Sequence, residues 1–369
     1  MRLMQILLSQ SEAGAETYFE KVVSAMAEDP SITQKVIIEQ LPSREHRLQQ
    51  AGVDFQTLPM GRISKPLLYN HILKSSIRRF SPDLIVTWVN RASRKCPETD
   101  AVVVGRLGGY YDINNYRKCD HLIVNTPDLV RHVVESGWDR HRVTMISNFG
   151  ELPDALNVPS QIPEVPGHHK TLLSLGRLHE KKAHDIIIKA LPQIPDATLL
   201  IAGSGDLKPS LEALARELGV ANRVQFLGLR KDIRQLFDLA DICVFPSRFE
   251  PLGNVILEAW ATGTPVVAAA SQGPSWLITD RENGLLFDID SPEQCARAVN
   301  TLLADPVLAH RLVQNGQKTF TEKFSRNVIL GQYKALFEEL IAVHKQGKRS
   351  KKFGEIPIAP KAIQPSDPT

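Results

Sequence analysis

Glu250 and Glu258 are the two residues of this sequence whose type and spacing most directly suggest chemistry. An apolar run ends at Phe245, a short loop follows, and Pro251 stands where the first turn of a helix tolerates proline. The loop would present Glu250 at the carboxyl end of a parallel sheet, where ligands bind in open α/β folds. Glu258 would lie further down the helix, where a carboxylate can accept both hydroxyls of a ribose.

The start of this predicted helix also offers a site for an anion. The free N–H groups of Gly253, Asn254 and Val255 would donate to phosphate oxygens. The alternative is that Glu250 caps the helix and that Glu258 is a solvated helix residue. The glycine stop of the helix and the strand predicted behind it favour the ligand-binding interpretation.

A second cluster, residues 173–183, places two cations after a predicted strand. The strand ends at Gly176, and Arg177 and Lys182 follow in the loop. One planar, forked cation and one point-like cation suit a diphosphate that is both bound and leaving. A solvated surface pair is the alternative, and the neighbouring Lys181 leaves the choice of lysine open.

Two further loops contain small residues directly after predicted strands. Residues 9–16 follow the first strand, so the backbone there can approach a phosphate or a sugar closely. Residues 202–206 contain a Gly-x-Gly pair but lack the third glycine of the dinucleotide fingerprint. We therefore do not expect a dinucleotide site.

These clusters need parallel sheets to bring strand ends together, and the sequence predicts such sheets. Apolar runs alternate with amphipathic helical stretches, as in sheets covered on both faces. The predicted strands span residues 3–9, 35–39, 83–89, 101–106, 121–125, 143–148, 171–175, 198–203, 224–228, 241–245, 265–270 and 284–287. Helices are predicted at 15–28, 66–80, 126–136, 209–218 and 292–304. The expected fold is α/β, with two doubly wound Rossmann-like domains.

Length agrees with this division, since 369 residues exceed one ordinary α/β domain and suffice for two. The proline-rich segment 151–168 is the predicted linker between a first domain, residues 1–150, and a second domain, residues 169–324. A long helix over residues 325–344 and a disordered tail over 345–369 complete the expected organisation.

Composition excludes several classes of protein. A net charge of +3 gives no argument for nucleic acid, and four scattered cysteines without a Cys-x-x-Cys pair argue against a zinc ribbon or a dithiol site. The apolar start at residues 2–9 is too short for a secretory signal, and no run reaches the length of a membrane span. We therefore expect a cytoplasmic protein without a nucleic-acid partner.

Taken together, these motifs resemble those of the family-4 retaining glycosyltransferases of the GT-B fold, or glycosyl transferases group 1. The matches run in order through most of the chain, and those of its second half are the specific ones. They are Ala13-Gly14-Ala15-Glu16, Gly176-Arg177 with Lys182, Ala202-Gly203-Ser204-Gly205, Glu250 with Glu258, Gly273-Pro274 and Asn283-Gly284-Leu285-Leu286.

The resemblance implies two domains that face a cleft, with the acceptor held mainly by the first and a nucleotide-sugar donor mainly by the second. The last helix would cross back to the first domain. Arg177 and Lys182 would hold the donor diphosphate. Glu258 would bind the ribose, and Glu250 would contact hydroxyls of the transferred sugar.

Two further donor contacts follow from the resemblance. Gly14 would line the phosphate side of the cleft, and the base would rest near Gly228, Leu229 and Arg230. Uridine diphosphate is the commonest nucleotide in such enzymes. We expect catalysis to depend on one glutamate and two cations, namely Glu250, Arg177 and Lys182.

The sequence departs from the family pattern in two places. Ala13 stands where a glycine is common, and residues 104–112 contain no histidine where many members have one at the reacting centre. Retention is thought to proceed on one face, with the leaving phosphate accepting the acceptor's proton, so a protein base is dispensable. Arg106, Tyr110 and Asp112 are the candidates for the vacant role on the acceptor side, and a purely packing role for this loop is the alternative.

No metal or other cofactor is expected. Asp288 and Asp290 form an Asp-x-Asp pair, but they precede a helix start at Ser291, where capping is more natural. The histidines lack the spacing of a zinc site.

Residues 60–95 are strongly basic, which suggests an anionic partner. Interleaved apolar residues accompany eight cations and one acid; the cations are Arg62, Lys65, Lys74, Arg78, Arg79, Arg91, Arg94 and Lys95. An ordinary amphipathic helix with solvated charges is one interpretation. The other is a surface for anionic lipid or a phosphorylated glycolipid acceptor.

The sequence thus favours a retaining glycosyltransferase that moves a sugar from a nucleotide donor to a saccharide or glycolipid acceptor of a cell-surface glycan such as lipopolysaccharide. The resemblance implies that this donor is a UDP-sugar. Two alternatives remain open. One is a nucleotide-sugar epimerase of the same architecture, and the other is a nucleotide-sugar-binding protein without catalysis.

Overall fold

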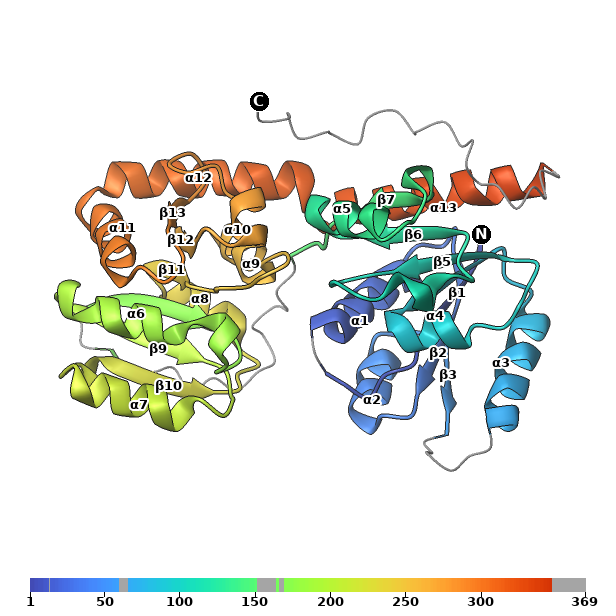
Figure 1. Ribbon diagram of the computed structural model, residues 1–369, viewed down its shortest axis with the longest axis horizontal. Coiled ribbons are helices and arrows are strands. Elements are labelled where there is room, and N and C mark those ends of the chain that lie inside the picture. Colours follow the sequence, from blue (N-terminus) through green and yellow to red (C-terminus); the bar gives the residue numbers. More distant parts are fainter. Residues whose placement is uncertain (13, 60–65, 151–163, 166–168, 347–369) are drawn as a thin grey trace. The chain divides into compact units, whose positions relative to one another are not determined.

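The structure is a computed structural model that describes residues 1–12, 14–59, 66–150, 164–165 and 169–346. The chain divides into two compact units. Unit 1 comprises Met1–Ser147 and Leu330–Thr369, and unit 2 comprises Asn148–Ile329. Figure 1 shows each unit as a sheet flanked by helices. The predicted linker, apart from residues 164 and 165, and the predicted tail from residue 347 onward lie outside the described residues.

Unit 1 is built on a seven-stranded sheet with the order β3-β2-β1-β4-β5-β6-β7. Every neighbouring pair of strands is parallel. The strands are β1 Arg2–Leu7, β2 Thr33–Glu39, β3 Phe55–Leu58, β4 Leu84–Trp88, β5 Val102–Arg106, β6 His121–Val124 and β7 Val143–Met145. The order reverses between β1 and β4, so the carboxyl ends of these two strands flank the switch point where open α/β sheets bind ligands.

Helices cover the sheet of unit 1 along its length. They are α1 Gly14–Ala27, α2 Pro42–Gln50, α3 Pro66–Phe80, α4 Val89–Lys95, α5 Pro127–Glu135 and most of α13 Arg326–Lys345, together with the 3-10 turns Ile113–Tyr116 and Arg140–Arg142. The last helix is anchored at both ends of its unit 1 portion. Lys334 Nζ lies 2.9 Å from Asp29 Oδ2, and His344 Nε2 lies 2.6 Å from the Asp100 carbonyl oxygen.

Unit 2 repeats the design with six parallel strands in the order β10-β9-β8-β11-β12-β13. The strands are β8 Lys170–Leu175, β9 Ala197–Ala202, β10 Val224–Gly228, β11 Ile242–Phe245, β12 Val266–Ala269 and β13 Leu285–Phe287. The helices are α6 His184–Ala190, α7 Lys208–Glu217, α8 Ile233–Leu239, α9 Asn254–Thr262, α10 Gln272–Leu277, α11 Pro292–Ala304 and α12 Pro306–Lys323. Short 3-10 turns span Glu180–Lys182, Leu191–Gln193 and Ala221–Arg223. Its switch point lies between β8 and β11.

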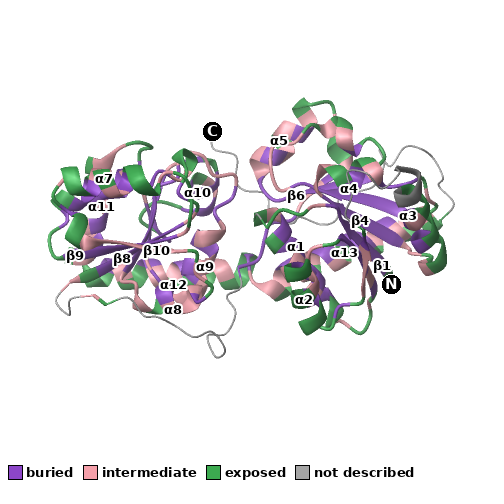
Figure 2. Ribbon diagram, turned by 90° about the horizontal axis from the view of Figure 1, so that it is seen from below, coloured by how far each residue is buried: buried purple, intermediate pink, exposed green. Residues whose placement is uncertain are grey.

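The central strands of both units are buried on both faces (Figure 2). Such strands need nearly continuous apolar runs, which is the pattern the sequence shows. The predicted fold class, two doubly wound α/β domains, is confirmed. The pattern predicts every strand except β3, a short edge strand of Phe-Gln-Thr-Leu with only one buried residue. None of the described helices has an apolar stretch long enough to cross a lipid bilayer.

Candidate active site

The two charged clusters found in the sequence meet at the switch point of unit 2. Residues 176–183 follow β8, and residues 246–253 follow β11. Because β8 and β11 are parallel neighbours, with Leu172 opposite Ile242, both loops leave the same edge of the sheet. This is the place where the order of the strands reverses, and therefore where a ligand is expected.

An ion pair joins the two loops. Lys182 Nζ donates a hydrogen bond to Glu250 Oε2, although the two residues are 68 positions apart in the chain. The side chains are only 24% and 15% exposed, so the pair is partly shielded from water. Lys182 Nζ also lies 5.5 Å from the centre of the Phe245 ring, at the end of β11. The structure thus brings together a predicted phosphate-binding cation and a predicted sugar-binding carboxylate.

The neighbouring lysine has a different environment. Lys181 is exposed, and its Nζ lies 5.0 Å from the centre of the Phe249 ring. Its carbonyl oxygen accepts from the backbone N–H groups of Arg248 and Phe249 at 2.9 and 3.3 Å. Lys182, and not Lys181, is therefore the lysine that contacts Glu250. Arg177 is exposed in the same loop, two residues after the end of β8.

The start of α9 has the form expected for an anion site. Gly253 is the N-cap, with φ of +96°, and no side chain caps the helix. The alternative of Glu250 as the cap is therefore wrong, since its carboxylate accepts from Lys182 instead. Asn254 is held by Asn148, whose Nδ2 donates to its Oδ1 at 2.9 Å. Val255 is partly buried in the first turn.

Glu258 lies on the same helix, α9, one turn beyond Asn254. It is half-buried, so it is not the fully solvated residue of the alternative interpretation. Its backbone carbonyl oxygen accepts from the Thr262 hydroxyl at 3.0 Å.

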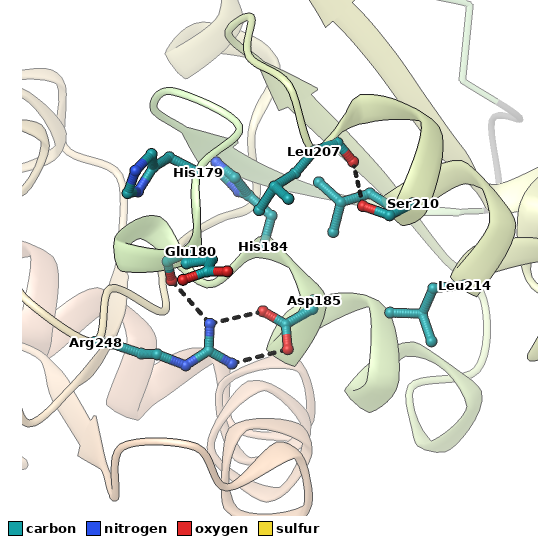
Figure 3. Close-up of a pocket in the computed structure, with 9 residues that line it drawn as sticks. His179, Glu180, His184, Asp185, Leu207, Ser210, Leu214 and Arg248 are labelled. Atoms are coloured by element: carbon teal, nitrogen blue, oxygen red, sulfur yellow. Dashed lines mark hydrogen bonds and ion pairs between the residues drawn. The ribbon is translucent and has the colours of Figure 1, made fainter.

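Arg248 is a component of the site to which the sequence alone gave no role. Its guanidinium donates to both carboxylate oxygens of Asp185 at 2.8 and 3.0 Å and to the Glu180 carbonyl oxygen at 2.8 Å (Figure 3). It also pairs with Asp290. These bonds fasten the loop of Glu250 to the loop of Lys182. Two features of the sequence could have indicated this contact: Arg248 is a cation inside the glutamate motif, and Asp185 is an acid three residues after Lys182.

The same contacts explain the Asp-x-Asp pair. Asp290 pairs with Arg248, and Asp288 Oδ2 accepts from Gln294 Nε2 at 2.6 Å. Ser291 itself caps α11. Among the described residues, no three His, Cys, Asp or Glu side chains gather as a metal site would require.

A pocket of about 420 Å³ lies beside Arg248 (Figure 3). Its polar wall includes His179, Glu180 and Asp185, and leucines of α7 form the other wall. Burial lowers the pKa of His184, which also lines it, to about 4, so this imidazole is neutral at physiological pH. Lys182 and Glu250 do not line the pocket, which is therefore adjacent to the ion pair and separate from it.

The Gly-Ser-Gly segment after β9 serves close packing. A Cβ atom on Gly203 would lie 1.8 Å from the Gly176 carbonyl oxygen, so no other residue fits there. Leu178 N donates to the Ser204 carbonyl oxygen at 3.0 Å, which fixes the loop that carries Arg177. Close packing therefore explains why glycines stand in this segment, and no bound dinucleotide is needed to explain them.

Arg230 follows β10 at the same edge of the sheet. Its Nε donates to Asp232 Oδ1 at 2.7 Å, and its Nη2 pairs with the second oxygen. The neighbouring Leu229 is 81% exposed. The exposed side chain of Leu229 and the guanidinium of Arg230, held by Asp232, thus lie where the sequence predicts the nucleotide base to bind.

Each acceptor-side candidate of unit 1 contacts neighbouring groups of the same unit. Arg106 is 4% exposed at the end of β5, and its Nε donates to Tyr333 Oη at 3.1 Å. Tyr110 donates to Asp128, and burial together with this bond raises the pKa of Tyr110 to about 12. Asp112 caps the turn Ile113–Tyr116. These contacts favour the packing interpretation of the loop.

A histidine that sequence adjacency does not reveal lies against this loop. His132, on α5, has its Nε2 3.0 Å from the Tyr111 carbonyl oxygen. Its ring packs edge-on against Tyr110, with 5.3 Å between ring centres. In the other predicted loop of unit 1, Gly14 begins α1 in an exposed position with open space around it. Ala13 lies outside the described residues.

Comparison with known proteins identifies a glycosyltransferase. The chain belongs to the glycosyl transferases group 1 family, whose model matches residues 160–319. It is 36% identical over 330 residues to the lipopolysaccharide core biosynthesis glycosyltransferase LpsE of Rhizobium meliloti (strain 1021), covering 87% of this chain and 95% of that protein. It is 31% identical over 345 residues to LpsD of the same organism, covering 93% of this chain and 99% of that protein.

The fold is also that of HepE from Anabaena, whose crystal structure in complex with UDP is similar with a TM-score of 0.77 at 21% identity. The match covers 92% of this chain and 100% of that one. HepE has also been solved with UDP-glucose.

We predict that Arg177→Ala and Lys182→Ala each weaken the binding of a nucleoside diphosphate by roughly 1.5–3 kcal/mol, the range for a hydrogen bond to a charged group. Titration calorimetry with UDP measures this change. Lys181→Ala is the matched control and should bind UDP like the wild type, because its side chain lies against Phe249. Unchanged affinity in both site variants would contradict the assignment.

Proposed function

We propose that this glycosyltransferase is a retaining enzyme that moves a sugar from a UDP-sugar to a saccharide or glycolipid acceptor in the synthesis of a lipopolysaccharide core or a similar cell-surface glycan. The Lys182–Glu250 pair at the switch point of unit 2 carries the proposal. The role of LpsE and LpsD in lipopolysaccharide core biosynthesis supports the acceptor class, and the UDP complex of HepE supports the donor.

The donor would lie across the two loops of unit 2. Arg177 and Lys182 would offset the charge of the diphosphate as it leaves, together with the N–H groups at the start of α9. Glu258 would accept the ribose hydroxyls. Glu250 would exchange its bond to Lys182 for a hydroxyl of the sugar. Lys182 would then turn to the phosphate.

The acceptor's proton would pass to the leaving phosphate on the same face of the sugar. This route needs no base from unit 1. It fits the state of Tyr110, whose phenol is protonated at neutral pH and is a still weaker acid than an ordinary tyrosine because its pKa is raised to about 12. It also fits Arg106 and Asp112, whose side chains already serve contacts within unit 1.

The proposal is tested with purified protein, a panel of nucleotide sugars and a lipopolysaccharide core acceptor. We expect transfer from a UDP-sugar, with a product whose anomeric configuration by NMR matches that of the donor. An inverted product would contradict retention. Conversion of the nucleotide sugar without acceptor would identify an epimerase, and binding without turnover would identify a non-catalytic protein.

The two glutamates should affect different kinetic constants. Glu258→Gln should mainly raise the KM for the donor, because ribose contacts are similar in the ground and transition states. Glu250→Gln should mainly lower kcat, because contacts to the sugar position the anomeric carbon. Steady-state kinetics with varied donor measures both effects. The same kinetic profile in the two variants would overturn this division of roles.

Transfer should require no divalent cation. The cations of the β8 loop and the helix start would perform the task that a metal performs elsewhere. Activity should therefore be unchanged after treatment with a chelator. Loss of activity that Mn²⁺ restores would contradict this expectation.

We also propose that unit 1 attaches reversibly to an anionic membrane surface. In α3, Lys74, Arg78 and Arg79 are exposed. Arg91 pairs with Glu39 at 2.8 Å, and Arg62 and Lys65 lie outside the described residues. A cation near an anionic surface contributes about 1 kcal/mol, so a few on one face suffice for attachment without a spanning helix.

Sedimentation with anionic and neutral vesicles tests this attachment. We predict binding to anionic vesicles only, with loss at high salt and in the triple variant Lys74→Glu, Arg78→Glu, Arg79→Glu. The control carries the same change of charge on α12 of unit 2, where Arg311, Lys318 and Lys323 are also exposed. Equal binding to both kinds of vesicle, or no loss of binding in the α3 variant, would favour a soluble acceptor.

A further inference from the structure

The loop after β1 occupies the switch point of unit 1. In the sheet of this unit the order reverses between β1 and β4, and residues 9–12 follow β1 on the way to α1. Across the switch point, Val89 directly follows β4 with φ of +61°. A β-branched residue in this left-handed region is strained, and such strain is retained where the surrounding structure fixes a functional backbone. The β1–α1 loop and the start of α4 thus lie at this switch point, and the backbone of Val89 at the start of α4 is held in a particular conformation.

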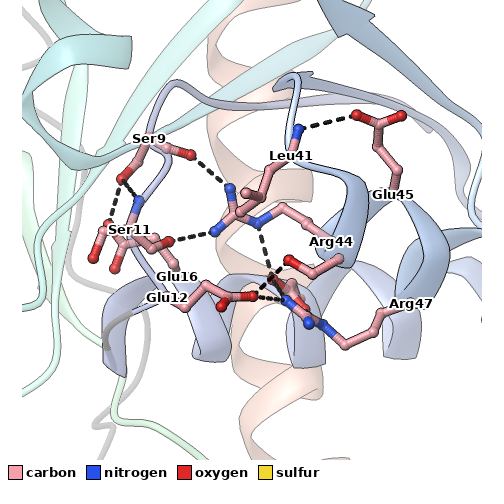
Figure 4. A network of polar contacts seen from close by, with 10 residues as sticks. Ser9, Ser11, Glu12, Glu16, Leu41, Arg44, Glu45 and Arg47 are labelled. Carbon is pink, nitrogen blue, oxygen red and sulfur yellow. Dashed lines mark hydrogen bonds and ion pairs between the residues drawn. The ribbon is translucent and has the colours of Figure 1, made fainter.

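A buried arginine determines the path of the β1–α1 loop. Arg44, on α2, is 0% exposed. Its Nη1 donates to the Ser9 carbonyl oxygen and its Nη2 to the Ser11 carbonyl oxygen, each at 2.6 Å, while Nε donates to Glu20 Oε1 at 2.9 Å (Figure 4). All three nitrogen atoms of the guanidinium are therefore engaged. A lysine ammonium cannot reproduce this planar fork.

Surrounding groups make the burial of this charge tolerable. Glu20 supplies the carboxylate that a buried cation requires, and its side chain is 12% exposed. Arg47, on the same helix, also contacts Glu20 and bonds to Glu12 at 2.9 Å. Removing one partner of such a buried pair is costly, but a buried pair is itself weak evidence for stability. The two bonds from Arg44 to backbone carbonyls are the feature that packing alone does not explain.

We propose that Arg44 is a positioning residue for sugar transfer, holding the β1–α1 loop in the conformation that receives substrate at the switch point of unit 1. The inference rests on the proposed function. A loop that is ordered before binding spares the substrate the cost of ordering it, and it keeps the reacting groups in register. The nucleotide would be bound mainly by the loops of unit 2, which Arg44 does not contact, so its affinity should depend on Arg44 much less than the rate of transfer does.

The test compares Arg44→Lys with Arg47→Lys. Arg47 is the matched control because it lies on the same helix and also bonds to Glu20, is 45% exposed, and contacts no loop carbonyl in the described structure. We expect Arg44→Lys to lower kcat with a UDP-sugar about tenfold or more, since a misplacement of about 1 Å can cost a hundredfold. Hydrogen exchange should accelerate at residues 9–12 and 14–16. The Kd for UDP should change much less than kcat, and Arg47→Lys should change none of these quantities.

Arg44→Gln is the second variant if Arg44→Lys does not fold, because its neutral amide buries no unpaired charge and can donate to one carbonyl. The same results are expected from it. Equal kcat in the Arg44 and Arg47 variants, or a loss of kcat that merely follows a loss of UDP binding, would overturn the positioning role. Absence of transfer by the wild-type protein would instead contradict the proposed function.

Discussion

Lys182 and Glu250 come from loops that follow neighbouring parallel strands, and their ion pair links those loops at the one edge of unit 2 where a ligand is expected. Both side chains are partly shielded from water, which strengthens their attraction relative to an exposed pair. Arg248 supports the pair by binding Asp185 and the Glu180 carbonyl oxygen across the same two loops. The loop of Glu250 leads directly into the start of α9, so the contact also helps to fix the position of that helix start.

The fold and the charged clusters of unit 2 could be predicted because their signals are local. Buried parallel strands require apolar runs, and loops at their carboxyl ends carry the charged motifs directly after those runs. Lys182 and Glu250 could therefore be named from the sequence. What could not be predicted is which groups they contact. In the sequence, Arg248 is recognisable only as a cation within the glutamate motif, because its partners Asp185 and Asp290 lie far from it in the chain.

Unit 1 was less predictable for the same physical reason. Strand β3 is a half-buried edge strand, and α2 is mostly polar, with Leu48 as its single buried apolar residue, so neither has a strong periodic pattern. Arg44 on that helix resembles a solvated cation in the sequence, yet it is buried against the backbone of residues 9 and 11. Arg106 and Tyr110 looked free to act on a substrate but are engaged within the unit.

If Glu250 binds Lys182 until the donor arrives, the most direct measurement is the affinity for UDP of Glu250→Gln, by titration calorimetry. UDP has no sugar to bind Glu250, and the variant frees Lys182 for the phosphates. We therefore predict tighter binding of UDP by Glu250→Gln than by the wild type. Glu180→Gln, which removes an exposed charge from the Lys182 loop without touching Lys182, should bind UDP nearly like the wild type. Weaker or unchanged binding by Glu250→Gln, or an equal gain in Glu180→Gln, would contradict the account.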